Sequence, residues 1–86
     1  MNFEFDKQKS KSNFKKHGID FLQAQILWED SDRLEVPARL ESEKRWILIG
    51  KIGSKHWSAI FTIRSNKIRI ISVRRSRKEE VEIYES

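Results

Sequence analysis

The chain has 86 residues, with 18 Lys or Arg against 13 Asp or Glu, so its formal net charge is +5 and its pI is about 9.7. This length suits one small domain, residues 1–86, and the basic balance favours an anionic partner without naming one. The absence of cysteine excludes disulfides and thiolate chemistry, and two histidines are too few for a zinc site. We therefore expect no metal and no cofactor.

Charge is unevenly distributed along the chain. Residues 7–16 hold five lysines and no acid, residues 64–78 hold seven basic residues and no acid, and residues 79–85 hold four glutamates. No apolar run approaches the roughly 18 residues that a membrane span needs. The N-terminus, MNFEFDKQ, also lacks the apolar core of a signal peptide. These patterns predict a cytoplasmic protein with no membrane contact.

The N-terminal part predicts a short strand and then a helix. Residues 2–5 form the strand, and Asp6 is a suitable N-cap for a helix over residues 7–17. Gly18 ends this helix because glycine takes the left-handed conformation without steric cost. The apolar face of the helix is thin, with Phe14 flanked by Ser10, Asn13 and His17, so the helix must be docked against the rest of the domain.

A second helix is predicted over residues 20–29. Asp20 caps it, and Gln23, three residues later, completes a capping box. The apolar residues that follow cover most of the helix circumference, which is typical of a short and largely buried helix. The sequence KHGID, residues 16–20, therefore predicts a tight corner between two helices.

Three strands are predicted next. Residues 33–38 include Pro37, which lacks an amide proton and so would confine this segment to a sheet edge or end it. Residues 45–52 and 56–64 alternate apolar side chains in the manner of strands. The dipeptide Ser65-Asn66 then predicts a two-residue hairpin, because Asn tolerates a positive φ.

The stretch KIRIISVRRSRK, residues 67–78, joins a strand to a basic cluster. Alternation places Ile68, Ile70 and Ser72 on one face of this strand, and Val73 on the other. The stretch ends in basic side chains that we expect to lie beyond the apolar positions, at the sheet rim: Arg74, Arg75, Arg77 and Lys78. The guanidinium group of arginine can donate two hydrogen bonds to phosphate oxygens, which favours RNA, DNA or an acidic protein as the partner. The alternative is a solvated strand end.

A C-terminal helix completes the predicted order β-α-α-β-β-β-β-α, with Ser76 as its N-cap and Glu79 in the capping-box position. This order indicates an α+β domain. We expect two N-terminal helices on one face of a twisted antiparallel sheet of about four strands, followed by the short C-terminal helix. The other face of the sheet then stays partly open, with the basic residues on or beside it.

The sequence holds no Gly-rich phosphate loop and no Ser-His-Asp arrangement. Its side chains suit cleavage of RNA, which supplies its own 2′-hydroxyl nucleophile and needs proton transfer and cationic groups from the protein. The candidates are Glu43, His17 and His56 for proton transfer, and Arg45, Arg69, Arg74 and Arg75 for holding charge. Each also has a plainer role as a surface or helix-corner residue. These residues alone predict a basic domain with an anionic partner.

Three segments resemble the BrnT family of bacterial type II toxins: FEFD with NFKKHGIDFLQA, SEKRWILIGKI, and KIRIISVRRSRKEE. The positions that carry the resemblance are residues 16–18 with Phe21, Glu43 and Arg45 with Gly50, and residues 69–75. The resemblance implies a fold similar to RelE-type ribonucleases and arrest of translation by RNA cleavage. It also implies a BrnA-like ribbon-helix-helix antitoxin, with operator DNA bound only through the toxin–antitoxin complex.

With this resemblance, we predict metal-independent transesterification that leaves a 2′,3′-cyclic phosphate. The predicted catalytic residues are Arg69, Arg74, Arg75, Arg45, Glu43 and His17, and the predicted RNA contacts are Lys16, Lys67, Arg77 and Lys78. The general base is not assigned. We expect loss of Arg74 or Arg75 to weaken toxicity more than folding. Two alternatives stay open, namely a non-catalytic nucleic-acid-binding module and an adaptor whose basic groove only receives an acidic antitoxin segment.

Overall fold

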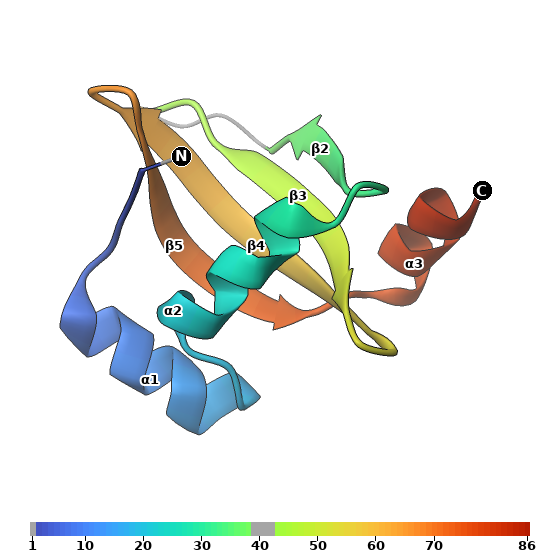
Figure 1. The fold of residues 1–86 in the computed structure, drawn as a ribbon, viewed down its shortest axis with the longest axis horizontal. Coiled ribbons are helices and arrows are strands. Elements are labelled where there is room, and N and C mark those ends of the chain that lie inside the picture. The colour runs from blue at the N-terminus through green and yellow to red at the C-terminus, as the bar shows by residue number, and fades with distance from the viewer. Residues whose placement is uncertain (1, 39–42) are drawn as a thin grey trace.

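The computed structural model describes residues 2–38 and 43–86. Within these residues a five-stranded sheet has the order β1-β5-β4-β3-β2 (Figure 1). The strands are β1 (Phe3–Glu4), β2 (Leu34–Pro37), β3 (Trp46–Ile52), β4 (Lys55–Arg64) and β5 (Lys67–Arg75). The helices are α1 (Lys7–His17), α2 (Phe21–Ala24), the 3₁₀ helix η1 (Gln25–Glu29) and α3 (Lys78–Glu85).

The α+β class is confirmed, but the sheet differs from the prediction. It has five strands where about four were expected, and β1 pairs with β5 in parallel, not antiparallel. The pairing joins segments 65 residues apart, with Phe3 opposite Ile68, so no local pattern reveals it. The prediction that Pro37 confines its strand to an edge is confirmed, because β2 lies at the end of the sheet.

Two layers of the fold are visible in Figure 1. Helices α1, α2 and η1 lie together on one face of the sheet, while α3 stands apart from them at the far end of β3 and β5. The core forms between the helical layer and the sheet. Trp28 of η1 is central to it, with edge-on contacts to Phe3 at 5.1 Å and to Phe61 at 5.2 Å between ring centroids. We call the other side of the sheet the open face.

The predicted helix ends are confirmed in the N-terminal part. The Asp6 side chain accepts hydrogen bonds from the backbone N–H groups of Gln8 and Lys9, and Gly18 has a φ of 78°. Asp20 and Gln23 form the predicted capping box. The second helix differs after that point, because the α-helical turn gives way to η1 at Gln25.

The second helix is also less buried than its apolar sequence predicted. Leu22 is 66% exposed and Ile26 is 47% exposed, so only one side of α2 and η1 packs on the sheet. Phe21, Ala24 and Leu27 supply that packed side. Trp28 joins them in the core, whereas Leu22 and Ile26 face outward from the helical layer.

Helix α1 is docked by polar side chains rather than by Phe14, which is 52% exposed. Asn13 is buried and donates from Nδ2 to the carbonyls of Ile19 at 2.8 Å and Val73 at 2.9 Å. Its Oδ1 accepts from the Val73 N–H at 3.2 Å. Asn13 therefore satisfies backbone groups of β5 as a neighbouring strand would. The predicted face is therefore confirmed at Ser10 and Asn13, which are buried, and was wrong at Phe14.

A β-bulge in β5 changes which side chains face the core. Ile60 pairs with Ser72 and Phe61 pairs with Ile70, so Ile71 has no residue opposite it. Beyond this point the alternation is shifted by one residue. Val73 is therefore fully buried in the core beside Ile70, and Ser72 faces away from it, which reverses the prediction for these two residues.

Helix α3 begins one residue later than predicted. Its N-cap is Arg77, whose backbone N–H donates to Glu80 at 2.8 Å. Ser76, the predicted N-cap, instead places its hydroxyl 2.8 Å from that of Ser58. Within the described part of the chain, no helix is long and apolar enough to cross a membrane.

Candidate functional site

The candidate site residues lie in separate parts of the fold. Glu43, Arg45 and Arg69 lie where the open face meets the β4–β5 hairpin, together with Glu4 and Arg64. We call these five residues the Glu43 cluster. Arg74 begins a second group at the opposite end of β5, five residues beyond Arg69. At about 3.3 Å per strand residue, their backbones are about 16 Å apart.

Glu43 is held by Arg64, the last residue of β4. Arg64 donates from Nε to Glu43 Oε2 at 2.8 Å and from Nη2 to Oε1 at 3.3 Å. These hydrogen bonds from Arg64 lower the pKa of the Glu43 carboxyl below its usual 4.5, and the charges of Arg45 and Arg69 lower it further. Glu43 is therefore an ionised carboxylate at neutral pH, close to three guanidinium groups.

The strand register positions Arg69 in this cluster. Arg69 is opposite Thr62 on β4 and opposite Glu4 on β1, and its Nη1 lies 3.3 Å from Glu4 Oε2. Thr62 is buried and donates to the carbonyl of Lys44 at 2.6 Å, which holds the segment before β3 over the open face. Glu43, which lies before β3, and Arg69, on β5, thereby approach each other although β3 and β5 are not neighbours in the sheet.

Arg45 has an unsatisfied donor in this cluster. Its Nε is buried and has no hydrogen-bond partner among the described residues. A buried N–H normally has a partner, because leaving it without one costs free energy. The charge of the cluster rests on the three guanidinium groups around Glu43, those of Arg45, Arg64 and Arg69, and this positive charge can attract a phosphate.

The β4–β5 hairpin positions Arg64 in the cluster and places Lys67 beside it. Ser65 and Asn66 have φ angles of 49° and 64°, which confirms the predicted two-residue turn. The turn pairs Arg64 with Lys67. Sequence reasoning selected Lys67 and missed Arg64. The available signal was the place of Arg64 at the base of the predicted hairpin, where it shares an end of the sheet with Glu43.

Arg74 is engaged in a structural ion pair. It faces Glu80 of α3 with two hydrogen bonds of 2.8 Å, and its side chain is only 20% exposed. Glu80 also accepts from Ser58 and from the Arg77 backbone, both at 2.8 Å. Arg74, chiefly, lowers the pKa of Glu80 to about 2. The expectation that Arg74 lies free beyond the apolar positions was wrong.

Arg75 lies on the opposite side of β5 from Arg74. It is exposed, and its guanidinium carbon is 5.4 Å from the centroid of the Trp57 ring. Trp57 and Gly18 line the same hollow of about 230 Å³, so Lys16 and His17 lie on this side of the sheet too. Two further basic candidates are exposed at the start of α3, Arg77 and Lys78.

Neither histidine joins the Glu43 cluster. His56 is at the far end of β4, where its Nε2 lies 2.7 Å from Glu85 and its ring meets Tyr84 edge-on. The Tyr84 hydroxyl donates to Asp30 at 2.6 Å, which raises the pKa of Tyr84 to about 12. Among the described residues no three His, Asp or Glu side chains converge as a metal site requires.

The arrangement suits anion binding on the open face, with an ionised carboxylate in the same cluster. Comparison with curated proteins gave no match. Comparison with protein-family models gave a match over residues 5–80 to the family described as the ribonuclease toxin, BrnT, of type II toxin–antitoxin systems. This match covers most of the chain, including all of the sheet beyond β1 and both groups of arginines. The chain therefore belongs to the BrnT family of ribonuclease toxins.

Proposed function

We propose that this protein is an endoribonuclease that cleaves RNA at the Glu43 cluster without a metal ion. The observation that carries the proposal is one ionised carboxylate, Glu43, beside the guanidinium groups of Arg45, Arg64 and Arg69. Transesterification of RNA requires a proton acceptor and cationic groups around the reacting phosphate. The cluster supplies both on an open surface that a single strand of RNA can reach.

In the proposed reaction Glu43 accepts the proton of the 2′-hydroxyl. The 2′-oxygen then attacks the adjacent phosphorus, the bond from phosphorus to the 5′-oxygen breaks, and that oxygen takes up a proton from water. The products are a 2′,3′-cyclic phosphate and a free 5′-hydroxyl. Arg69 and Arg45 stabilise the negative charge that builds up on the phosphate oxygens, while Arg64 holds Glu43 in place.

The other basic residues among the predicted site residues have no catalytic role in this proposal. Lys67 adjoins the cluster, whereas Arg77 and Lys78 lie further from Glu43 and would contact phosphates further along the strand. Arg74 is held by Glu80 and Arg75 lies on the helical side, so neither contacts the reacting phosphate. Lys16 and His17 are more distant again. We also propose that cleavage arrests translation and that a BrnA-like ribbon-helix-helix antitoxin neutralises the toxin. Operator DNA would be bound only through that complex.

The test is cleavage of RNA by the purified protein in EDTA, with analysis of the 3′ ends of the products. We expect 2′,3′-cyclic phosphate ends. Loss of a general base commonly lowers the rate about 10²- to 10⁴-fold, so Glu43→Gln should do so while Glu82→Gln, at an exposed position of α3, should not. Because the pKa of Glu43 is lowered, the acid limb of the rate profile should lie below pH 4.5.

Two results would contradict this proposal. A requirement for added Mg²⁺ would exclude the metal-independent reaction. Intact RNA after long incubation, together with binding that weakens as salt is raised, would instead favour a non-catalytic nucleic-acid-binding module. Growth arrest on expression without a partner would argue against the third possibility, an adaptor that only receives an antitoxin segment.

A further inference from the structure

Helix α1 has its polar and apolar sides reversed relative to an ordinary surface helix. Its buried side chains are Ser10 and Asn13, whereas Phe14, its one large apolar residue, is 52% exposed. An amphipathic helix normally buries its apolar residues and exposes its polar ones. Packing in the core therefore does not account for a large apolar side chain at Phe14, which faces outward from the helical layer.

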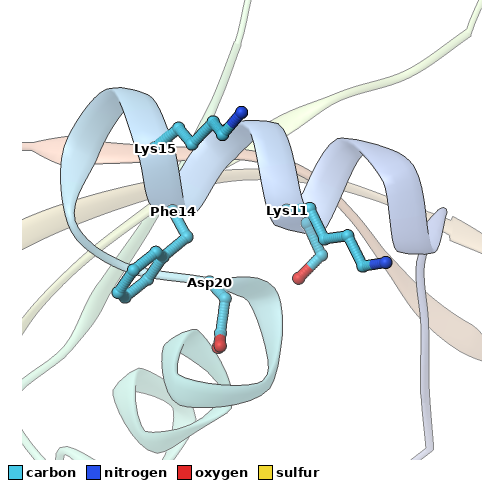
Figure 2. Close-up of a pocket in the computed structure, with 5 residues that line it drawn as sticks. Lys11, Phe14, Lys15 and Asp20 are labelled. Atoms are coloured by element: carbon cyan, nitrogen blue, oxygen red, sulfur yellow. The ribbon is translucent and has the colours of Figure 1, made fainter.

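Phe14 lines a hollow of about 410 Å³ between α1 and the start of α2. Figure 2 shows its ring leaning from α1 toward the corner where Asp20 lies, with the Lys11 and Lys15 side chains carried by the same helix. Ser10 completes the lining. Asp20 is already engaged, because its carboxylate accepts from the Gln23 N–H at 2.8 Å. The hollow thus combines an apolar wall with two exposed ammonium groups.

We infer that this hollow is a docking site for an acidic segment of the antitoxin, with an apolar side chain inserted against Phe14. The inference rests on the antitoxin partnership proposed above. Lys11 and Lys15 are one helical turn apart and flank Phe14, so carboxylates on either side of an inserted side chain can pair with them. The five lysines of α1 extend the same positive charge along the helix, with no acid between them.

The position of the hollow favours a protein partner over RNA. Exposed aromatic and basic side chains can also hold single-stranded RNA. However, the hollow lies on the helical layer, whereas Arg69 and Arg64 of the Glu43 cluster lie on the open face, on the opposite side of the sheet. A partner seated on α1 would therefore contact the toxin outside the proposed cleavage site.

The probe for this inference is the antitoxin encoded by the reading frame that adjoins the toxin gene, titrated into the purified toxin in a calorimeter. We expect Phe14→Ser and the double change Lys11→Glu with Lys15→Glu each to raise Kd at least about tenfold, a loss of roughly 1.4 kcal/mol. Lys9→Glu is the matched control, because Lys9 is exposed on α1 but does not line the hollow. It should change Kd less than about threefold.

Each variant is also assayed for RNA cleavage without antitoxin, and for thermal unfolding. Normal cleavage by all variants, with weaker antitoxin binding by the hollow variants alone, supports the inference. Wild-type antitoxin affinity in the hollow variants would overturn it, and so would loss of cleavage, which would assign the surface to RNA. If the wild-type toxin cleaves no RNA but the hollow variants still lose antitoxin, the docking site stands and the proposed activity fails.

Discussion

Replacing Glu80 with Gln tests the Arg74–Glu80 pair as a structural contact. The Glu80 side chain is 14% exposed, and its pKa falls from 4.5 to about 2 in the folded protein. Because each pKa unit corresponds to 1.36 kcal/mol, the folded environment stabilises the ionised carboxylate by about 3 kcal/mol. Glu80→Gln should therefore lower the free energy of unfolding at pH 7 by roughly 2–3 kcal/mol, since the amide keeps some hydrogen bonds. For a domain of this size, that lowers Tm by about 10–20 °C.

The pH dependence of this loss has a defined sign. A carboxyl group whose pKa is lowered by folding adds its full stability above its unfolded pKa, here 4.5. That stability is lost as the pH falls from 4.5 toward 2, because the unfolded chain then binds a proton that the folded chain does not. Gln cannot titrate. The stability difference between the wild type and Glu80→Gln should therefore be largest at pH 7 and much smaller at pH 3.

The assay is urea unfolding followed by tryptophan fluorescence at pH 7, 5, 4 and 3. The matched control is Glu79→Gln, which removes one negative charge from the neighbouring, exposed position of the same helix. If Glu79→Gln and Glu80→Gln destabilise the protein equally, the ion pair contributes nothing specific. A stability difference that stays constant down to pH 3 would refute the assigned pKa change.

Two further changes separate packing from polar docking. Asn13→Ala leaves backbone groups of Ile19 and Val73 without their partner and should lower the free energy of unfolding by about 2–4 kcal/mol. The control is Ser12→Ala, on the exposed side of α1, which should change the free energy of unfolding by less than about 0.5 kcal/mol. Equal urea midpoints for the two variants would refute the docking role of Asn13. Ile70→Ala should cost roughly 2–5 kcal/mol by opening a cavity in the core, measured in the same way; a loss under 1 kcal/mol would mean that the site collapses to fill it.

Local signals in the sequence predicted the ends of elements well. Asp6, Gly18 and the Asp20–Gln23 pair satisfy the backbone within a few residues of themselves, so their roles depend little on the rest of the fold. The Ser65-Asn66 turn belongs to the same class, because its φ angles are set by the two residues themselves. These features were therefore predictable before any tertiary contact was known.

Features that depend on distant contacts were not predictable. The parallel pairing of β1 with β5 and the hydrogen bonds of Asn13 with Val73 join segments at least 60 residues apart. Asn13 is a polar residue in a helix, and the sequence alone gives no sign that it faces a strand edge. Phe14 was assigned to the buried side for the same reason, since hydrophobicity normally indicates burial.

The candidate site was predicted in part. Glu43, Arg45, Arg69 and Lys67 come from two sequence segments, and the fold gathers them at one end of the open face. Arg64 was missed because its role depends on the hairpin register rather than on a motif. Arg74 was misjudged because its partner, Glu80, lies in a helix that follows the strand, so the charge run of residues 74–78 does not show which basic groups are already paired.

The bulge at Ile71 links the core to the basic end of β5. Without it, strict alternation would turn Val73 toward the open face and Arg74 toward the core, where burying a guanidinium without a partner is costly. With it, Val73 is fully buried and Arg74 reaches Glu80 on the open face. Arg75 then reaches the Trp57 ring on the helical side. Adjacent residues of a strand point to opposite faces, and the bulge decides that Arg74 takes the open face and Arg75 the helical side. The predicted basic cluster therefore does not act as a single site.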